Sequence, residues 1–203
     1  MKKRLLPIPL ILLIPVVLLI IVAVAGIYRF SLTDEEILAK FPNQAPQNNA
    51  IMAQVFGIKT TNPWTVKVPD SNAFTFIENL EHPPIATGSY EDGPVRGRVA
   101  INTEQIVKLN DTTYAVILAV SNQGSGVFYY LAVSKYDEFR QRMIINGGAL
   151  LGDRIKVAAI SAVDRLITIK LLEREANQSM AEEPSQITTI LFKLTEQDSL
   201  ELR

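Results

Sequence analysis

Residues 114–133 read YAVILAVSNQGSGVFYYLAV, two apolar runs joined by a polar, glycine-containing segment. Both runs are rich in β-branched and aromatic residues, which favour strands, and residues 122–126 are typical of a hairpin connection. Successive side chains of a strand point to opposite faces, and these runs are apolar at nearly every position. The pattern therefore predicts two central strands that are covered on both faces.

Similar strand-like runs surround this hairpin, and short turn sequences separate several of them, so an antiparallel meander is expected. The runs lie at residues 64–68, 95–101, 104–109, 155–162, 166–172 and 187–194. Helical signals are fewer. Residues 33–41 begin with a capping box, residues 50–57 are weakly amphipathic, and residues 135–145 carry apolar side chains at helical spacing.

The N-terminal segment contains an uncharged apolar run over residues 5–28, preceded by Lys2, Lys3 and Arg4. As a helix the run would extend about 36 Å, more than the roughly 30 Å hydrocarbon core of a bilayer. Basic residues stay on the cytoplasmic side, which predicts a retained single-pass signal-anchor in the cell membrane with the C-terminal domain extracytoplasmic. The alternative is secretion after cleavage near Ala25, where a small-x-small sequence occurs.

These elements predict an α+β fold class, in which an N-terminal transmembrane helix precedes a mainly antiparallel β-sheet domain with a few short helices. The expected divisions are a cytoplasmic basic tip and anchor over residues 1–30, short helices and a linker over 31–62, a β-rich extracytoplasmic domain over 63–195, and a frayed tail over 196–203.

Composition excludes several classes of function. Residues 31–203 keep all 21 acidic residues but lose four of the 20 basic ones, and a mildly acidic domain is not expected to bind nucleic acid. The chain has no cysteine, which excludes disulfides, thiol catalysis and iron–sulfur clusters. It has one histidine, which excludes a multi-histidine metal site within one chain. No metal and no cofactor are expected.

The sharpest polar motif is Asp153-Arg154, which follows Gly152. Arg154 could bind a ligand carboxylate, and Asp153 could act as a base or a ligand. The structural alternative, which we favour, is a turn in which Asp153 accepts bonds from local backbone amides. Tyr129 and Tyr130 are consecutive strand residues and must point to opposite faces, so one is expected in the core and the other could line a ligand groove.

Residues 46–80 contain Trp64, Phe74 and Phe76, which are candidates for partner docking if they form a contiguous exposed apolar patch. No pattern of acids, histidine or nucleophiles matches a catalytic site. An enzyme is therefore not expected.

Three passages together resemble an uncharacterised family of bacterial secreted or membrane-anchored β-rich domains. They are residues 124–131 (GSGVFYYL), residues 150–155 (LLGDRI), and residues 167–169 with the Glu173-Arg174, Met180-Ala181 and Pro184-Ser185 pairs that follow. The resemblance covers about residues 95–194. It implies an extracytoplasmic bacterial domain and implies no activity.

Two functions remain open. The first is a membrane-anchored, non-enzymatic interaction module, such as an accessory subunit of a membrane or envelope complex, with the lipid bilayer and an envelope protein as partners. The alternative is a membrane-tethered domain that binds or senses a small ligand through Arg154, Asp153 and Tyr129 or Tyr130. A flat exposed apolar patch favours docking, whereas a deep pocket favours a ligand.

Overall fold

The structure is a computed structural model that describes residues 10–31 and 48–203, except residues 176 and 180. It divides into two units, Met1–Gln47 and Asn48–Arg203. Each unit is described by itself. The helix that the sequence predicts over residues 33–41 lies outside the described residues.

The described part of the first unit is helix α1, Leu10–Ser31, which contains Pro15. Among the described residues, no helix has both the length and the apolar character that a membrane crossing requires. The predicted transmembrane anchor, and the single-pass localisation that depends on it, are therefore wrong.

The second unit is built almost entirely from strands, so the predicted α+β class is also wrong, although the β-rich character is confirmed. Within residues 48–203 as described, the helical segments are α3, Ala50–Phe56, and one 3₁₀ turn, η2, Thr103–Gln105. The strands of the first sheet are β1 Trp64–Lys67, β2 Phe74–Ile77, β3 Asn79–His82, β4 Ile85–Asp92, β5 Val95–Asn102, β6 Val107–Lys108, β7 Thr113–Ser121, β8 Val127–Asp137 and β9 Arg142–Asp153. The second sheet contains β10 Lys156–Val163, β11 Leu166–Glu173, β12 Gln186–Leu194 and β13 Leu200–Leu202.

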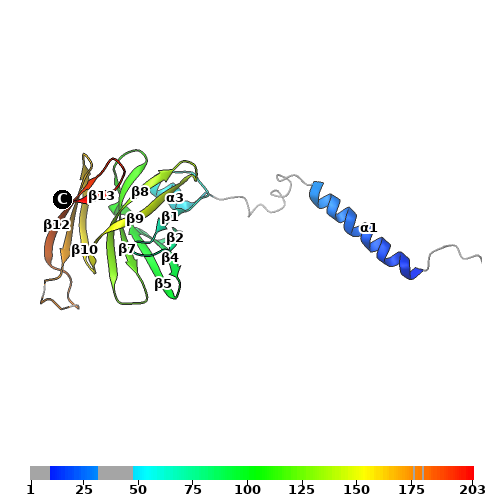
Figure 1. The fold of residues 1–203 in the computed structure, drawn as a ribbon, viewed down its shortest axis with the longest axis horizontal. Coiled ribbons are helices and arrows are strands. Elements are labelled where there is room, and N and C mark those ends of the chain that lie inside the picture. Colours follow the sequence, from blue (N-terminus) through cyan, green and yellow to red (C-terminus); the bar gives the residue numbers. More distant parts are fainter. Residues whose placement is uncertain (1–9, 32–47, 176, 180) are drawn as a thin grey trace, which may run out of the picture. The chain divides into compact units, whose positions relative to one another are not determined.

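The first sheet has the order β2-β1-β9-β8-β7-β5-β4-β3, with β6 paired to β7. Figure 1 labels most of these strands on the ribbon. Its pairs are antiparallel except β1 with β9, which run parallel. The sheet curls until β2 meets β4, where the Glu78 amide donates to the Thr87 carbonyl at 3.2 Å and the Thr75 hydroxyl donates to the Ser89 carbonyl at 2.7 Å. This contact between β2 and β4 is called the seam. It closes the sheet around an enclosed core.

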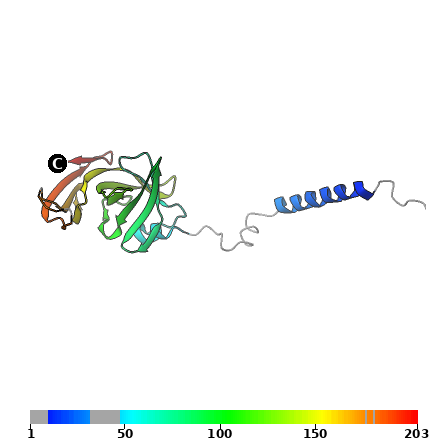
Figure 2. The ribbon, with the colours of Figure 1, turned by 90° about the horizontal axis from the view of Figure 1, so that it is seen from below.

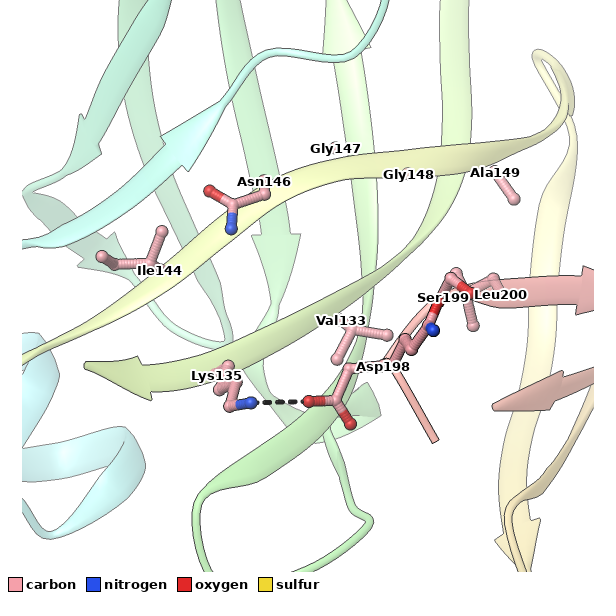
Figure 3. A pocket seen from close by; sticks show the side chains of 11 residues that line it. Val133, Lys135, Ile144, Asn146, Gly147, Gly148, Ala149, Asp198, Ser199 and Leu200 are labelled. Atoms are coloured by element: carbon pink, nitrogen blue, oxygen red, sulfur yellow. Dashed lines mark hydrogen bonds and ion pairs between the residues drawn. The ribbon is translucent and has the colours of Figure 1, made fainter. Parts of the chain in front are cut away.

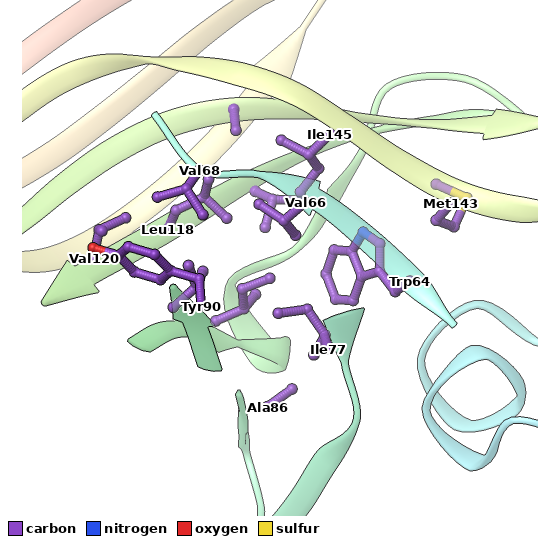
Figure 4. Close-up of a cluster of buried hydrophobic side chains, with 14 of the residues drawn as sticks. Trp64, Val66, Val68, Ile77, Ala86, Tyr90, Leu118, Val120, Met143 and Ile145 are labelled. Atoms are coloured by element: carbon purple, nitrogen blue, oxygen red, sulfur yellow. The ribbon is translucent and has the colours of Figure 1, made fainter. Parts of the chain in front are cut away.

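The enclosed core is formed by inward-facing side chains from strands all around the curled sheet (Figure 4). Trp64 is fully buried, and its indole nitrogen donates to the Ser134 hydroxyl at 3.0 Å. Helix α3 contributes Met52 to this core and places Phe56 edge-on against Trp64, with ring centroids 4.8 Å apart. The short amphipathic helix predicted over residues 50–57 is confirmed; in the structure Asn49 caps its start and Gly57, at φ 70°, ends it.

The four-stranded sheet β10-β11-β12-β13 lies beside the first sheet (Figure 2). A second core lies between this sheet and the outer face of the first sheet. Along β7, Val116 and Leu118 face the enclosed core, whereas Ala115 and Ile117 face the second sheet. Strand β8 is covered in the same way. The prediction that these two strands are central and buried on both faces is confirmed.

Two local predictions are wrong. The helix expected over residues 135–145 is a β-hairpin, because β8 continues to Asp137 and β9 begins at Arg142, with the Asp137 carboxylate accepting from the Arg140 amide in the turn. The apolar side chains there alternate between sheet faces and share no helix face. The tail over residues 196–203 is not frayed, because β13 pairs with β12.

Candidate functional site

Strand β9 contains a bulge at its middle, where the sheet loses regular pairing. Ala132 of β8 pairs with Gly148 and Ser134 pairs with Ile145, so two residues of β9 lie opposite one residue of β8. Gly147 in the bulge has φ 149°, a conformation that L side chains rarely adopt. The bulge opens space on both faces of β9.

On one face, the bulge lines an open cavity of about 510 Å³, here called the hairpin cavity, which the β12–β13 turn also lines (Figure 3). An ion pair crosses it, with the Lys135 ammonium 2.6 Å from the Asp198 carboxylate. The Lys135 side chain is more than half exposed, so solvent screens this pair and its contribution to stability is small.

On the other face, residues 146–148 line a second cavity of about 420 Å³, here called the loop cavity. Its remaining wall is the β1–β2 connection, with Lys67 and Asp70, together with Asp92 from the β4–β5 hairpin. The Ser71 hydroxyl donates to Asp92 at 2.6 Å and the Asn72 amide donates to the same oxygen at 3.2 Å. These bonds hold the β1–β2 connection against the β4–β5 hairpin.

Tyr130 lies in the enclosed core and bonds Asp70, which lines the loop cavity. Its hydroxyl donates to the Asp70 carboxylate at 2.9 Å, and Asp70 has a positive φ of 54°. Burial, followed by the hydrogen bond and the charge of Asp70, raises the pKa of Tyr130 to about 12. Burial also raises the pKa of Tyr90, with a smaller contribution from Asp92. Both phenols therefore remain neutral at physiological pH.

The raised pKa of Tyr130 predicts a loss of stability in alkaline solution. The folded state holds the phenolic proton more tightly than the unfolded chain, so the stabilisation is complete below pH ~10 and is lost as the pH rises toward ~12. Tyr130→Phe is expected to lower the unfolding free energy at neutral pH by about 1 kcal/mol and to flatten its decline above pH ~10. Urea unfolding of both proteins across this range measures the two slopes. Equal slopes would contradict the assignment.

Tyr129 and Tyr130 lie on opposite faces of β8, as the alternation of a strand predicts. Tyr130 packs in the enclosed core, whereas Tyr129 packs on the side of the second sheet and lines a groove of about 320 Å³ beside β10. Burial raises the pKa of Tyr129. The two phenols therefore cannot contribute to one pocket.

Asp153 and Arg154 join the end of β9 to the start of β8. Asp153 accepts from the Val127 amide at 3.0 Å and pairs with the Arg154 guanidinium at 2.7 Å, while the Arg154 amide donates to the Val127 carbonyl. The hydrogen bond from Arg154 is the main cause that lowers the pKa of Asp153. Neither side chain lines the cavities described above. Val127 lies 26 residues from Asp153 in the chain, so this bond does not come from a local amide as the structural alternative expects, and the structural and ligand-binding roles both remain predictions.

The three aromatic docking candidates have different environments. Trp64 is fully buried, so its predicted role in an exposed patch is wrong. Phe74 and Phe76 occupy alternate positions of β2 and are 58% and 45% exposed. Thr75 and Ile77, between and beyond them, face inward. The two phenylalanines therefore share the outer face of β2, and are here called the β2 aromatic pair.

A groove of about 350 Å³ lies beside the β2 aromatic pair at the seam. Its floor is formed by Thr87, Gly88 and Ser89 of β4. Phe76 and Glu78 of the β2 side line one wall, and Arg98 of β5 lines the other. This groove is here called the seam groove.

Sequence reasoning missed the loop cavity and the seam groove, because strands β2, β4 and β9 were not predicted. The Asn146-Gly147-Gly148 run could have indicated a bulge, since glycine within a strand often marks one. No sequence signal links Asp70 with Tyr130, which are 60 residues apart. Within the part of the chain that the structure describes, no group of three or more acidic, histidine or cysteine residues could hold a metal ion.

Comparisons with protein families, with curated proteins and with solved structures find no match to this chain. The resemblance to a bacterial β-rich family therefore stays a prediction from three sequence passages.

Proposed function

We propose that this protein is a non-enzymatic interaction module that binds another protein through the β2 aromatic pair. The observation that carries the proposal is the exposure of Phe74 and Phe76 side by side on one strand face. Aromatic side chains are enriched in protein interfaces, and they carry much of the binding energy there. Contiguous exposed apolar surface is typical of partner sites.

The position of the pair supports the same proposal. Phe139 is 93% exposed but lies alone in the β8–β9 turn, where a single surface phenylalanine requires no partner. Phe76 of the pair, in contrast, lines the seam groove, which supplies polar groups next to the apolar surface. An apolar centre with a polar rim is the usual arrangement of a protein interface.

The proposal predicts that Phe74→Ser with Phe76→Ser abolishes partner binding without unfolding the domain, because both side chains are exposed. A photo-crosslinking amino acid at position 74 or 76, in the cells that produce the protein, should give one discrete crosslinked product. The same amino acid at position 139 is the matched control and should not give that product. Crosslinking that is equal at the three positions, or unchanged by the two serines, would refute the proposal.

Small-ligand binding is the second candidate. It is favoured by the β9 bulge, which opens the hairpin cavity and the loop cavity on its two faces. Their charged and amide side chains are suited to a small polar ligand. The two candidate functions can be told apart, because serine at positions 74 and 76 should abolish partner binding but leave the binding of a small ligand in these cavities unchanged.

A further inference from the structure

The seam groove carries opposite charges on its two walls. Arg98 pairs with Ser89 in the β4–β5 ladder, and its guanidinium donates to the Thr87 hydroxyl at 2.9 Å. Glu78 lies on the other side of β4, because its amide donates to the Thr87 carbonyl. Strand β4, which forms the floor of the groove, therefore separates the positive wall at Arg98 from the negative wall at Glu78, and Phe76 lies on the negative side.

Arg98 is exposed and forms no ion pair with any described residue, whereas Arg96, two positions earlier on the same strand face, pairs with Glu91 at 3.3 Å. A guanidinium has five N–H donors in a fixed planar arrangement. The bond to Thr87 uses one of them and orients the group over the groove. The remaining donors match the geometry of a carboxylate.

Glu78 also forms no ion pair with any residue that the structure describes. A carboxylate placed against its wall would meet a like charge, which is unfavourable. The two walls therefore admit an acidic group on the β5 side and disfavour one on the β2 side. Specificity of this kind uses repulsion as well as attraction.

We infer that the partner presents an extended segment to the seam groove, with an apolar side chain against Phe76 and a carboxylate on the Arg98 guanidinium. This inference rests on the proposed docking function of the β2 aromatic pair, and it names the chemistry of the partner. The charge pattern of the walls specifies both the acidic residue and the side of β4 on which it binds.

Selection of phage-displayed random peptides on the immobilised full chain tests the inference. Enriched peptides are expected to carry an acidic residue close to an apolar one, and to bind the wild-type chain with an affinity that falls as salt is added. Arg98→Ala should weaken the enriched peptides about fivefold, the upper range for an exposed ion pair. Arg96→Ala is the matched control and should leave their affinity unchanged, since that side chain already has a partner.

The outcomes distinguish failure of the carboxylate assignment at Arg98 from failure of the docking face itself. Peptides that lose binding with serine at positions 74 and 76 but not with Arg98→Ala would overturn the carboxylate assignment and keep the docking face. Enriched peptides without acidic residues would do the same. Peptides whose affinity is unchanged both by serine at positions 74 and 76 and by Arg98→Ala would overturn the inference together with the docking of a linear segment at this face. A selection that enriches no peptide would have the same consequence.

Discussion

Replacing Trp64 by alanine is expected to lower the unfolding free energy of the β-sheet domain by about 3–5 kcal/mol, the usual cost of removing a buried tryptophan. The side chain is fully buried in the enclosed core and contacts Phe56 of α3 edge-on. The substitution would also leave the buried Ser134 hydroxyl without the indole donor that it accepts from. Domains of this size are stable by only about 5–15 kcal/mol, so the loss is a large fraction of the total.

Chemical denaturation of the wild type and Trp64→Ala at neutral pH measures this effect. Phe139→Ala is the matched control, because it removes an aromatic ring that is 93% exposed and should change the unfolding free energy by less than about 0.5 kcal/mol. A loss below about 1 kcal/mol for Trp64→Ala would contradict its place in the core.

Gly88→Ala is expected to destabilise the domain by about 3 kcal/mol, at the upper end of the range for overpacking. A Cβ at this position would overlap the Phe76 carbonyl oxygen, which is backbone and cannot rotate away. The Thr75 hydroxyl, which bonds the Ser89 carbonyl across the seam, lies next to the same point. The added methyl group would therefore force β2 and β4 apart where the first sheet closes.

The midpoint of thermal unfolding measures this second effect, and a loss of that size should lower it by roughly 6–12 °C for a domain of this length. Gly124→Ala is the matched control, because the nearest atom to its Cβ is the side-chain oxygen of Asn122, which can move. If the two alanine variants melted at the same temperature, the close contact at the seam would be disproved.

The parts of the fold that were predictable are those with a strong local pattern. Continuous apolar runs indicated β7 and β8 as central strands, and the turn residues between them indicated a hairpin. Helix α3 was predicted from its amphipathic spacing. Strands β2 and β4 were missed because β2 is short and β4 is interrupted by glycine and polar residues. Their strand conformation depends on packing against neighbouring strands more than on their own sequences.

Residues 135–145 were misinterpreted as a helix. Apolar content and spacing are consistent with several environments, and the environment is decided by what the rest of the chain supplies. Residues 135–145 had a plausible helical face, but pairing between β8 and β9 satisfies their backbone groups over a longer stretch. Of the three docking candidates, Phe74 and Phe76 are exposed and remain candidates, whereas Trp64 is buried and does not.

The sequence by itself determined that residues 63–195 are β-rich, that the chain has no disulfides, and which two strands are buried on both faces. These properties follow from composition and from side-chain alternation, which are local. Only the tertiary structure decided that the first sheet closes at the seam, that Tyr130 meets Asp70, and that Arg98 and Phe76 line one groove. These contacts join residues distant in the chain, and they depend on sheet curvature and register, which no local pattern of residues specifies.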